Sequence, residues 1–395
     1  MRTIDQFNFK GKKAIIRVDF NVPLNNRRVT DSSRILAAKE TILKVCNDGG
    51  SCILISHLGR PEGIQLEYSL EQIIDVVQTT IGKKVSFSKD IIGEEAVQKS
   101  SNLKSGDVLL LENIRFHKEE SEGDYDFAKK LSLLGDCYIN DAFGTAHRAH
   151  ASTTVVSSFF KNKFFGKLLE KEVLSIKKVM NSGEKPILAI LGGAKISSKI
   201  PILKNIIKIA DDIIIGGGMS FTFAKAIGGK IGKSIHEDSM LDQVKEIIQI
   251  AEKENVKIHI PVDVVCAKDF DNNSPTKIFD IMNINEEFEG MDAGPESLLK
   301  FKNIVLKSKT ILWNGPLGVF EFSNFANGTK ELGKYISEST RKGAFSLVGG
   351  GDSVAAVKSF NLEKNMSYVS TGGGAMLESL EGKNLPGISA LLNEQ

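Results

Sequence analysis

The sequence is poor in cysteine and tryptophan and has no long apolar run. Its four cysteines are Cys46, Cys52, Cys137 and Cys266. No two of them form a C-x-x-C pair, and none stands beside a histidine-rich segment. This scatter argues against a structural zinc site or a disulfide framework and fits a reducing compartment. No apolar run approaches the roughly 20 residues of a membrane span, and no secretory leader pattern is visible. We therefore expect a cytoplasmic protein that does not enter a membrane.

Charge of one sign is not in excess, because Lys+Arg number 51 and Asp+Glu 49, a formal net charge of +2. So small an excess argues against a general nucleic-acid binder. Arginine is nearly missing after residue 150, where Arg341 stands alone. The other eight are Arg2, Arg17, Arg27, Arg28, Arg34, Arg60, Arg115 and Arg148. Because guanidinium groups match phosphate and carboxylate oxygens, the first half predicts a small-anion site, although surface charge is the simpler reading of Arg2, Arg27 and Arg28.

Several familiar catalytic and nucleotide motifs are also missing. GGKIGKS (228–234) ends like a Walker A loop, but Ile227 stands where its first glycine should be. No G-x-G-x-x-G with a following acidic residue appears, which disfavours a nicotinamide dehydrogenase. There is no Ser-His-Asp order, no H-E-x-x-H and no evident general base beside a hydroxyl nucleophile. A nucleophile that is already anionic needs no base, so this absence favours phosphoryl transfer between two anions.

Short apolar runs alternate with longer amphipathic segments along all 395 residues. We expect strands at 14–18, 52–56, 108–111, 137–140, 187–191, 212–215, 257–260, 310–313, 344–348 and 367–370. We expect helices at 34–47, 70–81, 126–134, 242–254 and 324–339. Runs of Ile, Val and Leu separated by helices predict parallel strands covered on both faces. The fold class is therefore α/β, with two doubly wound, Rossmann-like parallel-sheet domains.

The boundary between the domains is expected near residues 164–180. Leu169, Val173, Ile176 and Met180 recur there at helical spacing, and Asn181-Ser182-Gly183 supplies a stop. This segment predicts an interdomain helix.

Glycine clusters follow four strands of the second half, at 191–199, 216–220, 349–353 and 371–375. Glycine lets the backbone approach phosphate oxygens, and the following helix start presents free N–H groups. Lys195 and Lys199 stand four apart beside the first cluster, and Asp352 follows the third as a hard oxygen donor for Mg²⁺. Taken singly, the two lysines are also typical of solvated surface charge, and Asp352 is also typical of a helix N-cap.

Polar side chains follow the strands of the first half instead. If those strands are neighbours, one sheet edge gathers Asp19, Asn21, His57, Arg60, Arg115 and Arg148. Such a set suits a small, multiply charged anion. Arg60 and Arg148 are the strongest candidates, whereas His147 and His150 are more typical of structural hydrogen bonding.

The ordered motifs resemble those of the phosphoglycerate kinase family over nearly the whole chain. They are RVDFNVP (17–23), SHLGRP (56–61), ENIRFH (112–117), DAFGTAHRAHAST (141–153), GGAKISSK (192–199), WNGPLGVFE (313–321), GGGDS (349–353) and STGGGA (370–375). The resemblance implies that the N-terminal domain binds 3-phosphoglycerate or 1,3-bisphosphoglycerate. The implied ligands are Asp19, Phe20, Asn21, Arg34, His57, Leu58, Gly59, Arg60, Arg115 and Arg148.

The same resemblance implies a C-terminal domain that binds ATP or ADP with Mg²⁺ as cofactor. The implied nucleotide ligands are Lys195, Lys199, Gly290, Asn314, Glu321, Gly350, Gly351, Asp352 and Ser353, with Asp352 nearest the metal. Hinge closure would bring the two substrates together, and Arg34, Lys199, Gly372 and Gly373 would stabilise the transferring phosphoryl group.

In the family the final residues return to the first domain. The implied domains are therefore 1–165 with 381–395, an interdomain helix at 166–181, and 182–380, in a monomer without nucleic-acid partners. The segment after Arg60 is shorter and less basic than the family pattern, and Ser353 replaces threonine. Two alternatives are a dehydrogenase, which would need a dinucleotide fingerprint, and a binding protein of the same fold without turnover.

Overall fold

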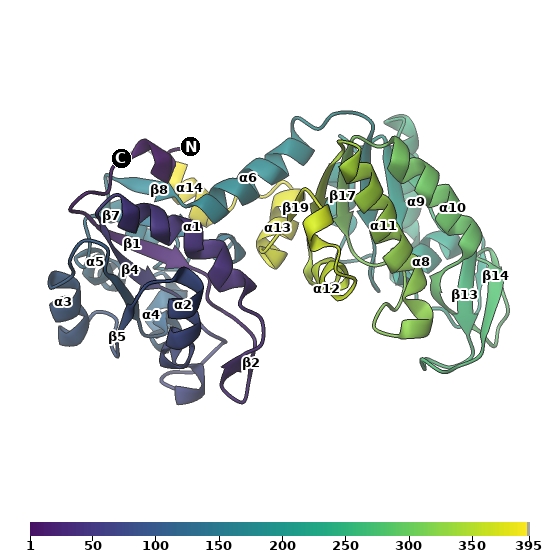
Figure 1. Ribbon diagram of the computed structural model, residues 1–395. Coiled ribbons are helices and arrows are strands. Elements are labelled where there is room, and N and C mark those ends of the chain that lie inside the picture. The colour runs from purple at the N-terminus through teal and green to yellow at the C-terminus, as the bar shows by residue number, and fades with distance from the viewer. Residues whose placement is uncertain (393–395) are drawn as a thin grey trace. The chain divides into compact units, whose positions relative to one another are not determined.

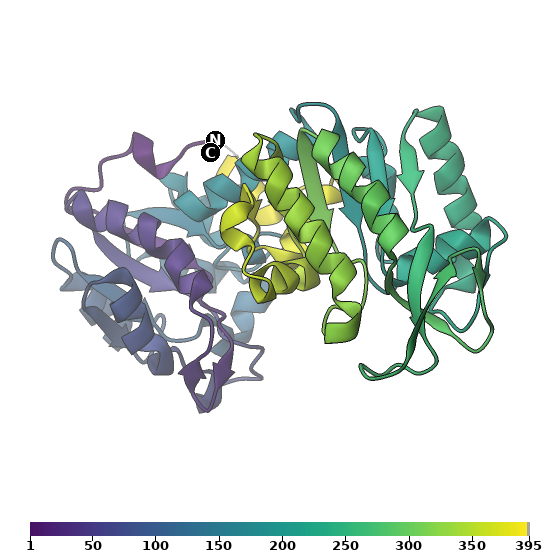
Figure 2. The same ribbon diagram turned by 45° about the vertical axis from the view of Figure 1, so that its right-hand side comes forward.

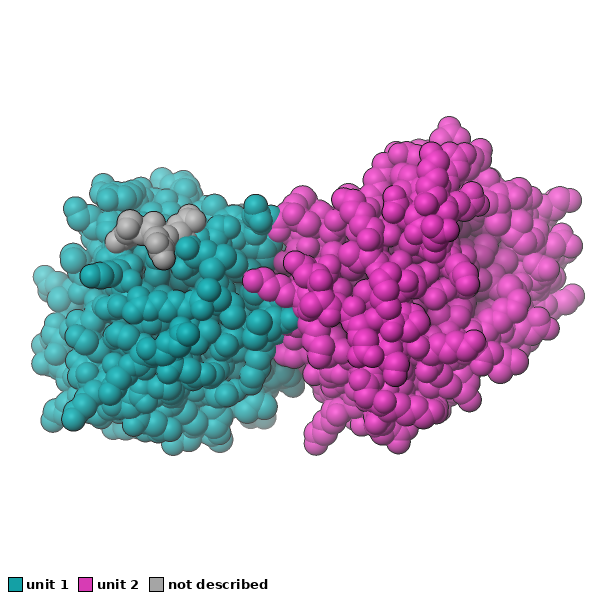
Figure 3. Space-filling view, turned by 90° about the horizontal axis from the view of Figure 1, so that it is seen from above, with its two compact units in different colours: residues 1–174, 384–395 teal, residues 175–383 magenta. Residues whose placement is uncertain are grey.

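The computed structural model describes residues 1–392 and divides the chain into two compact units. Among these residues, one unit contains 1–174 and 384–392, and the other contains Ser175–Lys383 (Figure 3). This division falls within helix α6 (Lys167–Met180), and the domain limits expected from the family pattern stay a prediction. Residues 393–395, which were assigned to the N-terminal domain, lie outside the described residues. Among residues 1–392, no helix is long and apolar enough to cross a membrane.

The first unit contains a parallel sheet of six strands in the order β5-β6-β4-β1-β7-β8 (Figure 1). Its strands are β1 (Lys13–Val18), β4 (Ser51–Ile55), β5 (Val85–Ser88), β6 (Val108–Leu111), β7 (Cys137–Asp141) and β8 (Lys163–Phe165). From β1 the chain goes to β4 and on to the edge strand β5, returns to β6 between them, and then crosses to β7 on the other side of β1. A ligand site is expected outside the carboxyl ends of β1, β4 and β7, where the strand order reverses.

The helices of the first unit cover this sheet. They are α1 (Ser33–Asn47), α2 (Ile74–Ile81), α3 (Glu94–Ser101), α4 (Lys118–Glu122), α5 (Tyr125–Ser132) and α14 (Pro386–Leu392), and a hairpin of β2 (Leu24–Asn25) and β3 (Arg28–Val29) precedes α1. Ile42 of α1 and Val77 of α2 belong to one buried cluster with Ile16 and Leu54 of the sheet. Since Ala14–Val18 is buried on both faces of β1, the reading of its apolar run as a covered parallel strand is confirmed.

The second unit repeats this plan with a parallel sheet in the order β12-β10-β9-β17-β18-β19. The strands are β9 (Ile187–Leu191), β10 (Asp212–Ile215), β12 (Lys257–His259), β17 (Thr310–Asn314), β18 (Phe345–Val348) and β19 (Tyr368–Val369). The order reverses between β9 and β17, so the glycine loops after these two strands flank the expected ligand position. The predicted fold class, α/β with two parallel sheets, is confirmed.

The helices of the second unit are α7 (Ile200–Ile206), α8 (Gly218–Ala226), α9 (Leu241–Lys253), α10 (Pro295–Lys307), α11 (Asn327–Arg341), α12 (Gly351–Ser359) and α13 (Gly373–Leu380). The views in Figures 1 and 2 show α10 and α11 running side by side. Phe301 of α10 and Ile336 of α11 share a buried cluster with Trp313 of β17. Because Trp313 is fully buried next to Asn314, the core of this unit supports the end of β17 directly.

Several strands were not predicted. The second unit has an additional antiparallel sheet of β13 (Asp263–Ala267), β14 (Thr276–Asp280) and β16 (Glu289–Ala293), and a short pair of β11 (Lys230–Ile231) and β15 (Asn283–Ile284). β14 is largely exposed, and the register between β13 and β16 shifts at Val265 and Cys266, where Met291 of β16 has no partner residue. The edge strands β5 and β8 were also missed, because such short strands carry little periodicity.

Helix α6 begins on a buried carboxylate of the first unit. Asp141 Oδ1 accepts the N–H groups of Leu168 (2.8 Å) and Leu169 (3.1 Å), and Thr41 Oγ1 accepts that of Lys167 (2.8 Å). These bonds satisfy donors that a helix start leaves unpaired. Burial raises the pKa of Asp141 to about 7 despite these bonds.

Candidate active site

The carboxyl ends of β1 and β4 bring four predicted residues into direct contact. Asp19 Oδ2 lies 2.7 Å from Arg34 Nη1, which comes from the first turn of α1. Asn21 Oδ1 accepts the Gly59 N–H at 2.8 Å, so the segment after β1 is tied to the segment after β4. Phe20 and Leu58 are buried beneath these polar contacts. Asp19 thus orients the Arg34 guanidinium group.

His57 is held by an arginine whose structural importance the sequence did not reveal. Arg17 is fully buried, and its Nη2 lies 3.3 Å from His57 Nδ1. Arginine can only donate, so Nδ1 accepts and the ring proton sits on Nε2. Burial, together with the charges of Arg17, Arg115 and Arg34, holds the pKa of His57 well below its usual range. His57 is therefore neutral at neutral pH and offers one N–H donor.

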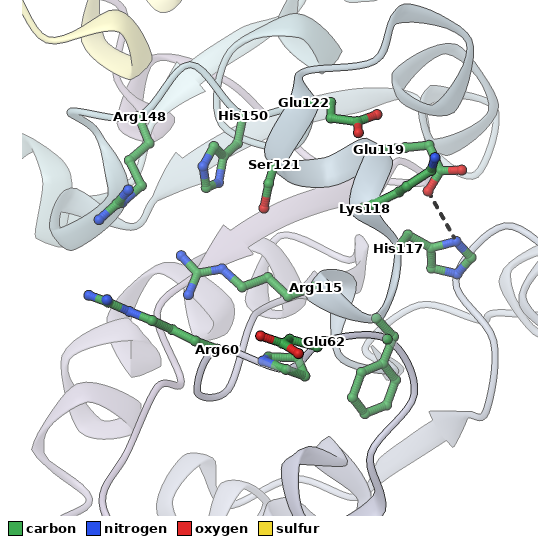
Figure 4. Close-up of a pocket in the computed structure, with 13 residues that line it drawn as sticks. Arg60, Glu62, Arg115, His117, Lys118, Glu119, Ser121, Glu122, Arg148 and His150 are labelled. Atoms are coloured by element: carbon green, nitrogen blue, oxygen red, sulfur yellow. Dashed lines mark ion pairs between the residues drawn. The ribbon is translucent and has the colours of Figure 1, made fainter.

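A cavity of about 880 Å³ lies beside these residues in the first unit. Arg60, Arg115 and Arg148 line it, and Figure 4 shows their guanidinium groups gathered on one side, with His117 on the other. Arg115 Nη1 donates to Gly59 O at 2.8 Å. Burial and the neighbouring charges of Arg17 and Arg148 lower the pKa of Arg115 to about 10, so the group stays charged. Glu62, Glu119 and Glu122 also line the cavity, so its positive character is concentrated where the three guanidinium groups gather. That part of the cavity suits a multiply charged anion.

Only part of the predicted set lines this cavity. The lining includes Arg60, Arg115 and Arg148, together with His117, Lys118 and His150, which were not predicted as ligands. The other predicted residues are Asp19, Phe20, Asn21, Arg34, His57, Leu58 and Gly59, which form the buried and hydrogen-bonded layer next to it. A basic sequence around ENIRFHK was the one signal that could have identified His117 and Lys118.

In the second unit, glycines at the ends of β9 and β17 pack against one another. A Cβ on Gly192 would lie 2.0 Å from Pro316 O, and a Cβ on Gly315 would lie 2.2 Å from Gly192 O. Both glycines are therefore required by the close approach of two loops, whether or not a ligand binds. Around Gly193 and Gly351, in contrast, a Cβ would meet nothing within 4 Å. Both positions face open space, although the φ of 123° at Gly193 favours glycine there in any case.

Two adjoining hollows lie over these loops, and both are lined by Gly193, Ala194 and Asp352. The more polar hollow, of about 370 Å³, contains most of the predicted nucleotide ligands: Lys195, Lys199, Asn314, Gly350, Gly351, Asp352 and Ser353. The other, of about 260 Å³, is lined by Glu321 and by apolar side chains that the sequence did not single out, including Phe221, Leu317 and Met291. The pair suits a ligand with a charged part and a flat apolar part.

Lys199 is the most buried cation of the polar hollow. Its Nζ donates to Asn314 Oδ1, while Asn314 Nδ2 donates to Gly349 O at 2.7 Å. Burial lowers the pKa of Lys199, although the charges of Asp352 and Glu381 oppose this shift. Lys195 is exposed at the rim. The Ser353 hydroxyl accepts the Gly315 N–H, so this side chain supports the loop after β17.

A family model described as phosphoglycerate kinase matches residues 4–383. The chain belongs to the phosphoglycerate kinase family. A relative of that name from Porphyromonas gingivalis is 49% identical over 415 residues, which cover 98% of this chain and 99% of the relative. One from Chloroherpeton thalassium is 47% identical over 393 residues, or 99% of each chain.

Solved structures agree with this family assignment. The phosphoglycerate kinase from Coxiella burnetii is similar with a TM-score of 0.92 and 38% identity, over 99% of this chain and 98% of that one. That from Pyrococcus horikoshii gives a TM-score of 0.84 and 32% identity over the same shares. The resemblance inferred from the motifs is thereby confirmed, and the chain is a kinase of glycolysis.

The family uses Mg-ATP, and the residues of this chain fit a metal of that kind. Asp352 is exposed in the first turn of α12 and faces both hollows. Within residues 1–392, no group of three or more His, Cys, Asp or Glu side chains could hold a metal ion. One carboxylate beside a phosphate site fits Mg²⁺ that is held mainly by phosphate oxygens and water, and does not fit an all-protein cage.

Three predicted glycines line neither hollow. Gly290 donates its N–H to Ser234 Oγ at 2.9 Å, and a Cβ there would lie 2.1 Å from Phe221. Gly290 thus supports Phe221, which does line the apolar hollow. Gly372 and Gly373 lie at the start of α13, where the Gly372 N–H donates to Ser370 Oγ at 3.1 Å. Their assignment to catalysis stays a prediction.

Proposed function

We propose that the basic cavity of the first unit binds 3-phosphoglycerate and 1,3-bisphosphoglycerate. The observation that carries this proposal is the convergence of Arg60, Arg115 and Arg148, from three different strand ends, on one cavity. Three guanidinium groups offer enough donors for a phosphate and a carboxylate in one small molecule. Neutral His57 and the Asp19–Arg34 pair adjoin this cavity and supply further oriented donors.

The two hollows of the second unit bind ATP and ADP in this proposal. The polar hollow takes the phosphates, which meet Lys195, Lys199 and the backbone around Gly351. The apolar hollow takes the base and ribose, with Glu321 as the ribose ligand and Phe221 in the apolar wall. Asp352 would hold the Mg²⁺, which would neutralise phosphate charge when bound.

Phosphoryl transfer needs alignment and charge neutralisation in this site, and no general base. The carboxylate oxygen of 3-phosphoglycerate attacks the γ-phosphorus of ATP, a new P–O bond forms, and the bond to the ADP oxygen breaks. Because the attacking carboxylate is already ionised, no proton has to be removed. Arg34, Lys199 and the N–H groups of Gly372 and Gly373 stabilise the transferring group once hinge closure has excluded water.

A coupled assay tests the proposed substrates. Purified protein with 3-phosphoglycerate, ATP and Mg²⁺ should form an acyl phosphate and ADP, and both should stop when Mg²⁺ is chelated. In a thermal-shift comparison Mg-ADP should raise the melting temperature and NAD should not. No product with both substrates present would refute the proposal. We further propose that the protein works as a cytoplasmic monomer.

A further inference from the structure

A buried row of polar groups runs behind the basic cavity. Arg17 Nε donates to Ser152 Oγ (2.8 Å), and the Ser152 hydroxyl donates to Glu120 Oε1 (2.7 Å). Glu120 Oε2 accepts the Ser152 N–H (2.8 Å), and its main-chain oxygen accepts the Ala151 N–H (2.9 Å). His150 Nδ1 lies 3.6 Å from Glu120 Oε1. Arg17, Ser152 and Glu120 are all fully buried.

Glu120 keeps its negative charge in this buried position. Although burial favours the neutral acid, the neighbouring His150 ring, the charge of Arg17 and the two bonds from Ser152 hold the pKa of Glu120 below its ordinary value. A buried carboxylate that satisfies several donors is costly to remove, because its partners are left unpaired. The carboxylate therefore restrains the groups around it.

Those groups lie on two of the segments that line the basic cavity and on β1 beside it. Glu120 lies in α4, which follows Arg115 directly along the chain. Its partners at 150–152 follow Arg148, and Arg17 of β1 reaches from the same row to His57. One carboxylate thus links the segment after Arg115 to the segment after Arg148, and through Ser152 and Arg17 the row extends to His57.

We propose that Glu120 is a positioning residue of the phosphoglycerate site, which holds the segments that carry Arg115 and Arg148 at the separation that the anion requires. It acts through Arg17, Ser152 and His150, and does not itself line the cavity. The inference rests on the function proposed above for this cavity. If Glu120 acted only through its charge, its removal would make the cavity more positive, and the anion would bind more tightly. A positioning role requires the opposite result.

The full-length variants Glu120→Gln and Ser152→Ala test this role. Glu120→Gln is nearly isosteric and removes the charge, whereas Ser152→Ala keeps the charge and removes the link to Arg17. With saturating Mg-ATP, each should raise the KM for 3-phosphoglycerate about tenfold and change kcat by less than about threefold. The KM for Mg-ATP should not change. The double variant should show clearly less than the product of the two effects, since both act through one network.

Asp90→Ala is the matched control for lost stability. Asp90 Oδ1 accepts the Ala96 N–H (2.8 Å) at the start of α3 in the same unit, and it lines none of the three cavities. This variant should lower the melting temperature and leave both KM values unchanged.

The inference is overturned by an unchanged or lower KM in Glu120→Gln, or by an equal rise in Asp90→Ala. If Glu120→Gln does not fold, an unchanged KM in Ser152→Ala overturns it. No saturation of the unaltered chain by 3-phosphoglycerate would instead refute the function proposed for the cavity.

Discussion

The candidate sites of the two units lie at equivalent places in similar sheets, but one is made mainly of side chains and the other mainly of backbone. In the first unit, side chains of Arg60, Arg115 and Arg148 project into the cavity, and buried partners such as Arg17 and Glu120 hold the segments behind them. In the second unit the loops after β9 and β17 meet backbone to backbone. A site of side chains depends on charges and their partners, whereas a site of backbone depends on the absence of side chains.

This difference separates two roles of glycine in the second unit. Gly192 and Gly315 are needed for the packing of two loops, whereas Gly351 has no close neighbour and leaves space beside the polar hollow. The same residue type therefore serves stability at one position and ligand access at another.

The largest effect is expected from Arg34 in the first unit. We expect Arg34→Ala to lower kcat by at least about 10²-fold, because its interaction with the transferring group forms mainly in the transition state. The KM for Mg-ATP should change little. Steady-state kinetics with both substrates measure this. Arg341→Ala, at the exposed end of α11, is the control and should behave like the parent chain. An unchanged kcat would remove Arg34 from the catalytic role.

A side chain of the second unit should matter next. Lys199→Met removes a half-buried cation from the polar hollow, and we expect kcat/KM for Mg-ATP to fall about 30-fold, as for a lost hydrogen bond to a charged group. Lys204→Met in α7 serves as the control, because Lys204 is exposed and pairs with Glu246 at the surface. Equal kinetics in the two variants would contradict the assignment of Lys199.

Two alanine substitutions sharpen the distinction between the glycines. Gly192→Ala forces a Cβ against Pro316 O and should lower the free energy of unfolding by about 2 kcal/mol, as overpacking does. Gly351→Ala should leave stability within about 0.5 kcal/mol. It should nevertheless raise the KM for Mg-ATP about fivefold, because its methyl group enters the phosphate space. Chemical denaturation measures the stability of both variants, and steady-state kinetics measure their KM for Mg-ATP. A Gly351→Ala variant with the parent KM would exclude Gly351 as a ligand position.

The smallest effect concerns pH and is shared by the two units. Burial raises the pKa values of Asp141 and Asp292 from 3.8 to about 7 in the folded chain. Between about pH 4 and pH 7 the folded state holds protons that the unfolded state has released, so stability falls as the pH rises through this window. Asp141→Asn or Asp292→Asn should each reduce that loss by about 1–2 kcal/mol between pH 5 and pH 8. A parallel pH profile of stability in parent and variants would contradict these shifts.

Strong local patterns made the central strands of both sheets predictable from the sequence. Runs such as Ile187–Leu191 between helix-length segments indicated them, because buried parallel strands are apolar on both faces. β14 could not be found in this way, since its stability comes from pairing with β13 and its exposed residues show no alternation. The short edge strands β5 and β8 were missed because they too carry little pattern of their own.

The types of ligand residue in the candidate site could be predicted from the sequence. The residues that hold those ligands in position were less predictable. Arg60 and Arg148 stand beside strand ends, and their type alone indicates anion binding. Nothing in the sequence shows that Glu120 reaches Ser152, because the two lie 32 residues apart and meet only in the fold. Gly192 and Gly351 look alike in sequence, and only the distance from a would-be Cβ to its neighbours distinguishes them.

The central claim is that the acid substrate depends on side chains of the first unit and the nucleotide on loops of the second. Isothermal titration calorimetry of each ligand against the parent chain and an Arg60→Ala, Arg148→Ala double variant tests it most directly. We expect the variant to bind 3-phosphoglycerate at least about 100-fold more weakly and Mg-ADP within about twofold of the parent. Unchanged 3-phosphoglycerate binding, or an equal loss of both ligands, would contradict the claim.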